Sequence, residues 1–164
     1  MSTSMQAASQ PTRWSTRGRL AGTGVVAVAA AASMAVYAAY GDPHPKASQE
    51  QGVPFLIAIS VMVGAVVFGL LVPRALQAVR VASPGAPRWA LGHGIVAVVL
   101  VAAFWSGLPL VVGPAAVILG VEGRRWAEQQ SQPRGRYSAT LALGLVALAV
   151  SIALTVVGNT VGVH

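Results

Sequence analysis

The sequence predicts an all-α integral membrane protein, a bundle of five transmembrane helices arranged as two hairpins and a C-terminal span. Two observations lead to this fold class. Hydrophobic residues make up 55% of the 164 residues and charged residues only 9%, whereas an ordinary soluble domain carries about 25% charged residues. The hydrophobic residues also gather in uninterrupted runs about as long as a bilayer is thick. Such a chain cannot cover itself with polar surface, and its solvent is lipid.

The first run lies near the N-terminus. Residues 1–19 are polar and end in basic side chains, and we expect them to form a disordered cytoplasmic tail. The run 20–40 carries no charge and at 1.5 Å per residue extends about 31 Å, enough to cross the hydrocarbon core. We predict that it is an uncleaved anchor. A secretory signal peptide cut near Val36-Tyr37-Ala38 is the alternative.

The second run, 53–72, completes the first hairpin. It also carries no charge, and Pro73 is expected to end the span. The segment 73–88 contains three arginines and a turn-forming stretch, Ser83-Pro84-Gly85-Ala86-Pro87. This composition predicts a helical extension followed by a loop.

The third run, 89–121, is too long for one straight helix, because its 33 residues would reach about 50 Å against a core of about 30 Å. Ser106-Gly107-Leu108-Pro109 near its middle favours a turn, which divides the run into helices at 89–105 and 108–121. The second of these is short and has room to lengthen inward. Whether the hairpin crosses the membrane or is re-entrant stays open, although Trp105 favours the far side.

The last uncharged run, 138–158, predicts the fifth span, followed by a short external tail at 159–164. The spans together form one transmembrane domain, 20–158. With the N-terminus inside, all ten arginines fall on the cytoplasmic side and only Lys46 lies outside, as the positive-inside rule requires. The C-terminus is then outside. The Ala-, Val-, Gly- and Arg-rich composition suggests a bacterial inner membrane.

The predicted spans lack the charged side chains that catalysis within a membrane usually requires. They contain no Asp, Glu, Lys or Arg, the groups that ion-coupled transporters and intramembrane proteases use within the bilayer. The chain has no cysteine, which excludes disulfides and thiolate metal sites. We therefore expect no enzymatic activity, no cofactor and no metal. An enzyme acting on a lipid through His93, Glu122 or Glu128 is a third alternative.

His93, between Gly92 and Gly94, is the only ionisable residue inside an apolar run. It could bind a ligand or a proton near the cytoplasmic mouth, since histidine titrates near neutral pH and glycine allows close approach. The alternative is a histidine hydrogen-bonded in the headgroup region, about one helical turn inside Trp89, and we favour it. His44 with Asp42 could contribute to an external metal site, but a proline-rich turn explains them sufficiently.

Four arginines lie between the fourth and fifth spans. They could contact an anionic lipid or an acidic partner, although holding this loop in the cytoplasm is a sufficient role. Because basic residues occur only in short segments between apolar runs, we expect membrane lipids as partners and no nucleic acid. The four residues are Arg124, Arg125, Arg134 and Arg136.

Small residues recur at helical spacing and predict close helix packing in lipid. We favour packing within the monomer over self-association. Pro109 and Pro114 are expected to kink or break the fourth helix. The two stripes of small residues are Ala27, Ala31, Ala35 and Ala39, and Ala147, Ser151 and Thr155.

Function follows from the sequence only by elimination. Spans and interfaces without a catalytic site predict a non-enzymatic accessory or scaffold component of a membrane complex, with other membrane proteins as partners. The alternative is a small transporter or channel that forms its pathway by oligomerising and uses His93, the hydroxyl side chains and the break between Pro109 and Pro114.

Overall fold

The computed structural model describes residues 13–40 and 47–160, and every regular element in these ranges is helical, which confirms the all-α class. Short connections join the helices. In chain order the elements are α1 (Arg13–Tyr40), α2 (Ala47–Val66), the π-helical η1 (Val67–Leu71), α3 (Val72–Arg80), α4 (Ala86–Leu100), the 3₁₀-helical η2 (Val101–Ser106), α5 (Leu108–Gln129) and α6 (Gly135–Thr160).

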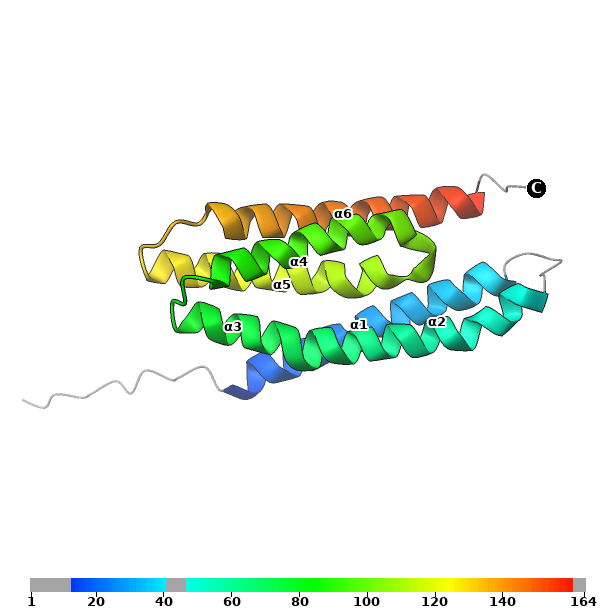
Figure 1. The fold of residues 1–164 in the computed structure, drawn as a ribbon, viewed down its shortest axis with the longest axis horizontal. Helices are drawn as coiled ribbons and strands as arrows, with labels where there is room; N and C mark the ends of the chain where they lie inside the picture. The colour runs from blue at the N-terminus through cyan, green and yellow to red at the C-terminus, as the bar shows by residue number, and fades with distance from the viewer. Residues whose placement is uncertain (1–12, 41–46, 161–164) are drawn as a thin grey trace, which may run out of the picture.

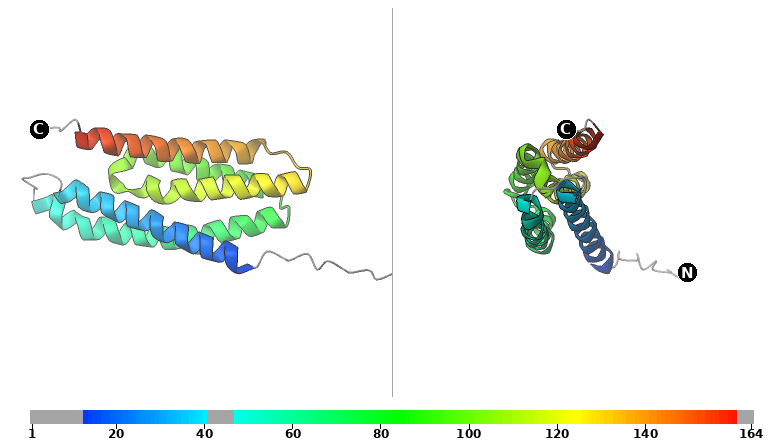
Figure 2. Two further views of the ribbon diagram at one scale, coloured as in Figure 1. Left: turned by 180° about the vertical axis from the view of Figure 1, so that it is seen from behind. Right: turned by 90° about the vertical axis from the view of Figure 1, so that its right-hand side faces the viewer.

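The long helices lie side by side in an elongated bundle (Figure 1). One layer holds α1 and the continuous α2–η1–α3 helix, and the other holds α4, α5 and α6 (Figures 1 and 2). The helix α5 packs against α6, α4, α1, α3 and α2. Its buried residues lie at the centre of the hydrophobic core, where Val111, Ala115 and Leu119 are fully buried.

Among the described residues, four helical stretches are long and apolar enough to cross a membrane: Gly18–Tyr37, Gln51–Arg80, Ala86–Ala103 and Gly135–Val157. Large hydrophobic side chains such as Val25, Phe55 and Ile152 are exposed on them, as expected for helices that face lipid. The fourth predicted span, 108–121, corresponds to the first part of α5 (Leu108–Gln129). Its apolar part is shorter, because Glu122, Arg124 and Arg125 follow within the same helix.

Several boundaries differ from the predicted ones. Helix α1 begins at Arg13 rather than at Leu20, so 13–19 extend the helix instead of belonging to a disordered tail. Extending an existing helix costs far less than nucleating a new one, which explains the extra turns. Helix α6 likewise continues to Thr160. The rest of both tails, together with Asp42, His44 and Lys46, lies outside the described residues.

Pro73 does not end the second helix, because the chain continues as α3 to Arg80. Proline has no N–H and its ring crowds the preceding turn, which loosens the hydrogen bonding there. The loosened turn is η1, where the Val72 N–H donates to the Val67 carbonyl five residues back. The expected helical extension is thus confirmed, and it is joined to the span through a π-helical turn.

The predicted turn between 89–105 and 108–121 is confirmed at Gly107, which has a φ of 71°. Ser106 Oγ donates to the Ala103 carbonyl at 2.6 Å and accepts from the Leu108 N–H at 3.3 Å, which ends η2 and starts α5. The turn packs on α1: a Cβ at Gly107 would lie 2.9 Å from the Ala31 Cα. In Figures 1 and 2 this turn stops short of the ends of α1, α2 and α6.

The two prolines were expected to kink or break this helix, and they do not break it, because α5 is one continuous helix. Pro109 lies in the first turn, where its missing N–H has no helical partner to lose. Pro114 lies inside the helix and removes one backbone hydrogen bond without ending it.

The small-residue stripes pack inside the monomer. Ala27, Ala31 and Ala35 on α1 are buried, as are Ala147 and Ser151 on α6. Thr155 Oγ1 donates to the Ser151 carbonyl at 2.7 Å. The side chain of Ala39 is outside the described ones.

Candidate functional site

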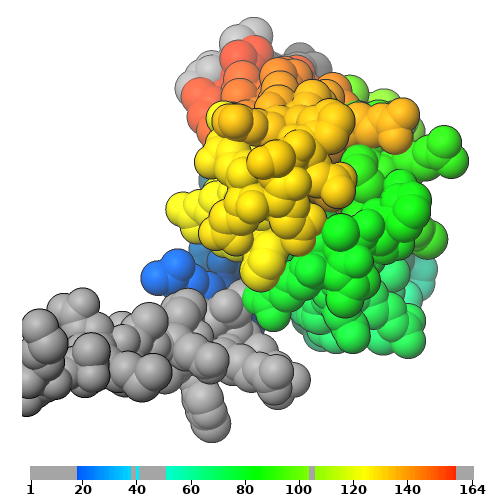
Figure 3. All heavy atoms as spheres, turned by 90° about the vertical axis from the view of Figure 1, so that its left-hand side faces the viewer, coloured from blue at the N-terminus to red at the C-terminus, as the bar shows by residue number. Residues whose placement is uncertain are grey.

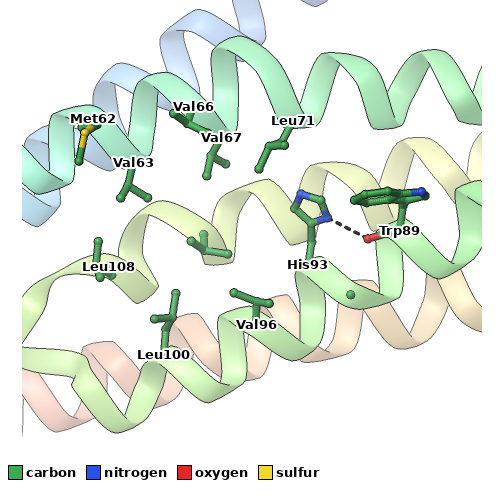
Figure 4. Close-up of a pocket in the computed structure, with 12 residues that line it drawn as sticks. Met62, Val63, Val66, Val67, Leu71, Trp89, His93, Val96, Leu100 and Leu108 are labelled. Atoms are coloured by element: carbon green, nitrogen blue, oxygen red, sulfur yellow. Dashed lines mark hydrogen bonds between the residues drawn. The ribbon is translucent and has the colours of Figure 1, made fainter.

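A pocket lies between α2–η1 and α4. It has a volume of about 640 Å³, and Figure 4 shows aliphatic side chains from the two helices pointing towards each other across it. Part of α5 forms its floor. The lining residues are Met62, Val63, Val66, Val67 and Leu71 from α2–η1, Trp89, Gly92, His93, Val96 and Leu100 from α4, and Leu108 and Val112 from α5.

The pocket lies between α2 and α4 because each of these helices packs mainly against other helices of the bundle. Helix α2 packs against α1 and α5, whereas α4 packs against α5, α6 and α3. The π-helical turn η1 contributes Val67 and Leu71 to the lining. Such turns occur often at functional sites, because they displace side chains from regular α-helical positions.

His93 supplies the one titratable side chain in the lining. Its Nδ1 lies 2.8 Å from the Trp89 carbonyl oxygen, as the dashed line in Figure 4 marks. Its Nε2 is buried and meets no hydrogen-bond partner among the described residues. The pocket therefore combines an apolar wall with a single unsatisfied polar atom.

The hydrogen bond to Trp89 determines what the free nitrogen can do. A carbonyl oxygen only accepts, so Nδ1 must carry the hydrogen and donate it. In the neutral imidazole the other nitrogen then has a lone pair and no hydrogen. In the neutral ring, Nε2 of His93 is accordingly an acceptor.

The rim of the pocket is open at two places. Trp89 is 64% exposed, and a Cβ added at Gly92 would meet no atom within 4 Å. The exposed Met62, Val66 and Val96 complete the rim. A molecule moving in the lipid that surrounds α2 and α4 can therefore reach the lining.

The geometry around His93 agrees in part with each of the two hypotheses, the structural histidine and the ligand-binding histidine. The backbone hydrogen bond is the one expected of a structural histidine, and the unpartnered nitrogen is the one expected of a ligand-binding histidine. The lipid-enzyme set, in contrast, is not brought together. Neither Glu122 nor Glu128 lines the pocket, and each is bonded to an arginine.

The α3–α4 and α5–α6 connections lie next to each other at one end of the bundle (Figure 3). We call this the arginine-rich end, because the chain on either side of these connections contains Arg80, Arg88, Arg124, Arg125, Arg134 and Arg136. Two of the four predicted lipid-contact residues are paired internally: Arg125 with Glu122 at 3.2 Å and Arg134 with Glu128 at 2.9 Å. Four arginines and two glutamates leave a net charge of +2 in this segment. Arg136 is exposed and Arg124 partly exposed.

Sequence reasoning singled out His93 but missed the aliphatic wall opposite it. Valine and methionine in an apolar run carry no signal that separates a pocket wall from a lipid-facing surface. Pro73 was the available signal for η1, since a proline within a long helix disturbs the preceding turn. Within the described residues, no group of three His, Cys, Asp or Glu side chains could hold a metal ion.

Comparison with known proteins returned no family model, no curated protein and no solved structure that matches the chain.

Proposed function

We propose that the protein is a non-enzymatic accessory component of a membrane complex, and that it holds an apolar molecule in the pocket between α2–η1 and α4. The pocket carries this proposal. Its volume of about 640 Å³ falls within the range of roughly 300–1,000 Å³ typical of ligand sites. Apart from His93 and the rim Trp89, the lining is aliphatic or glycine, which suits a molecule taken from the bilayer.

The proposed role is to hold the molecule rather than to convert it. General acid–base or nucleophilic chemistry needs a second group within hydrogen-bond reach of the reacting atoms. The lining provides one titratable side chain, and its Nδ1 is already engaged by the Trp89 carbonyl. A partner protein would then receive or use the bound molecule.

We further propose that the membrane is a bacterial inner membrane and that the arginine-rich end faces the cytoplasm. The clustering of basic residues at the α3–α4 and α5–α6 connections supports this orientation. Single cysteines at Ser48, Ser106 and Ser131 can test it with an impermeant thiol reagent on intact cells, since the chain has no cysteine of its own. We expect labelling at Ser48 and protection at Ser131. Labelling at Ser106 would indicate a hairpin that crosses, and protection there a re-entrant hairpin.

The binding role is tested by purifying the full chain in a mild detergent and identifying co-purified molecules by mass spectrometry. Gly92→Leu should place a side chain in the open space of the pocket and abolish retention of an apolar molecule. Gly22→Leu is the matched control, because Gly22 on α1 also has no atom within 4 Å of an added Cβ and does not line the pocket. Equal retention by both variants would contradict the proposal.

The accessory role needs its own measurement. A partner protein should co-purify with the wild-type chain and be identified by cross-linking in the membrane. A chain that retains the molecule but never a partner would refute the accessory role and leave the binding role standing.

A second candidate is a small oligomeric transporter or channel. The observation that favours it is the unpartnered nitrogen of His93, which could interact with a passing solute. Burial of the Ala27, Ala31 and Ala35 stripe removes one surface through which copies could associate. Flux through reconstituted vesicles that His93→Ala changes would favour this candidate over the binding role.

A further inference from the structure

We infer that the pocket takes a lipid alcohol, a molecule with a long apolar chain and a hydroxyl group that donates a hydrogen bond to Nε2 of His93. This inference rests on the proposed binding role and adds the chemical class of the ligand. Two observations carry it, the direction of the His93 hydrogen bond and the position of His93 along the pocket.

The first step concerns the acceptor. Nε2 is buried, and no described residue supplies a donor to it. An unsatisfied buried acceptor is costly, and most buried polar atoms in proteins are paired. A ligand with an O–H or N–H group would satisfy this nitrogen. A ligand with only ether, ester or ketone oxygens would place an acceptor oxygen against the acceptor Nε2, and no hydrogen bond would form.

The second step concerns the charge of the ring. A protonated imidazole could donate to a carbonyl or a phosphate, but an imidazolium among aliphatic side chains needs a nearby carboxylate to offset its desolvation. Glu122 and Glu128 do not line the pocket, and both are bonded to arginines. The neutral ring, and with it a donor on the ligand, fits this environment.

The third step concerns orientation. His93 lies one turn beyond Trp89, at the end of the pocket nearest to the first turn of α4 and its Arg88. From His93 the lining continues along α4 to Leu100, a rise of about 10 Å. A bound lipid alcohol would thus keep its hydroxyl near the headgroup layer at the arginine-rich end and its chain towards the middle of the bundle. This is also how such a molecule orients in a leaflet.

The test compares two probes with the same C16 chain, of which one has an O–H donor and the other has a methyl group in place of that hydrogen. Binding of hexadecanol and of hexadecyl methyl ether to the full chain is measured by native mass spectrometry in one detergent. We expect the alcohol to bind wild-type protein about tenfold more tightly than the ether, the ratio that one net hydrogen bond of ordinary strength supplies. His93→Phe keeps a ring of similar size without the nitrogen, and should bind both probes equally.

The controls separate this inference from the role on which it rests. Gly92→Leu should abolish binding of both probes, and Gly22→Leu should change neither. If wild-type protein binds alcohol and ether equally, or prefers the ether, and Gly92→Leu still abolishes binding, the hydroxyl inference is overturned and the pocket role stands. If neither probe binds, or if binding is insensitive to Gly92→Leu, both are overturned.

Discussion

The α5–α6 interface and the α2–α4 region are opposite solutions to packing in lipid. Along α5–α6 the helices meet through glycine: a Cβ at Gly120 would lie 2.6 Å from the Cβ of Leu141, and one at Gly113 would lie 2.8 Å from Leu148. Across α2–α4, branched and long side chains such as Met62 and Val96 line a pocket. The backbones of α5 and α6 are in close contact, whereas α2 and α4 are separated by the pocket.

The difference shows what decides helix contact when the solvent is itself apolar. Moving an aliphatic side chain from lipid into a helix interface gains little free energy, because both environments are apolar. Helices therefore pack closely where small residues allow the backbones to approach. Gly120 and Gly144 provide such places on both partners of the α5–α6 pair. Among the residues that line the pocket, Gly92 on α4 is the one glycine, and α2 contributes none. The two backbones therefore stay apart, and the pocket remains between them. Substitutions at glycine can therefore test the closed and the open region separately.

The largest effect is expected from Gly120→Val. The new side chain would collide with the Leu141 backbone, whose N and Cα lie 2.7 Å from the added Cβ, and would force α5 and α6 apart. We expect the free energy of unfolding to fall by about 3 kcal/mol. Reversible unfolding in mixed micelles, followed by circular dichroism, measures it. Gly22→Val, in open space, should change stability by no more than about 0.5 kcal/mol; a similar loss in both would contradict glycine-mediated packing.

A smaller loss is expected from Gly107→Ala at the turn that joins the two regions. Its φ of 71° disfavours a side chain, and the added Cβ would lie 2.9 Å from the Ala31 backbone. The left-handed conformation alone costs about 1–2 kcal/mol. The same unfolding assay checks this value. In Gly85→Ala the φ is −81° and the nearest atom is at 3.6 Å, an ordinary contact, so an equal loss there would count against the turn geometry.

The smallest effect is expected on the open side. Gly92→Ala adds a methyl group where nothing lies within 4 Å, and alanine favours the helix over glycine by about 0.5–1 kcal/mol. Thermal unfolding should show this gain. Gly94→Ala, two residues along the same helix, should not, because its Cβ would lie 3.2 Å from Leu143 and 3.3 Å from the Thr140 Cα. Loss of stability in Gly92→Ala would mean that the pocket is not open there.

The sequence predicted what depends on local composition. The uncharged runs predicted the apolar helices, and Gly107 with Pro109 predicted the turn between α4 and α5. The helical extension after Pro73 was expected, but the π-helical turn that precedes this proline was not. Gly113, Gly120 and Gly144 were overlooked, although their spacing on facing helices was a readable signal.

The candidate site was predictable only in part. His93 stood out because it is the single ionisable residue in its run, and its bond to the Trp89 carbonyl agrees with the expected structural histidine. The pocket depends on the distance between α2 and α4, two helices whose separation is set by their packing on α5. No pattern within either helix encodes that distance.

The contact between Gly107 and Ala31 has a consequence for the order of assembly. Peptide groups in a turn need cover where water is scarce, and α1 provides that cover with a fully buried alanine. Because α1 precedes α4 and α5 in the chain, we expect it to be synthesised and folded before the turn between them. The contact would then form between a helix that is already folded and a turn that is synthesised later.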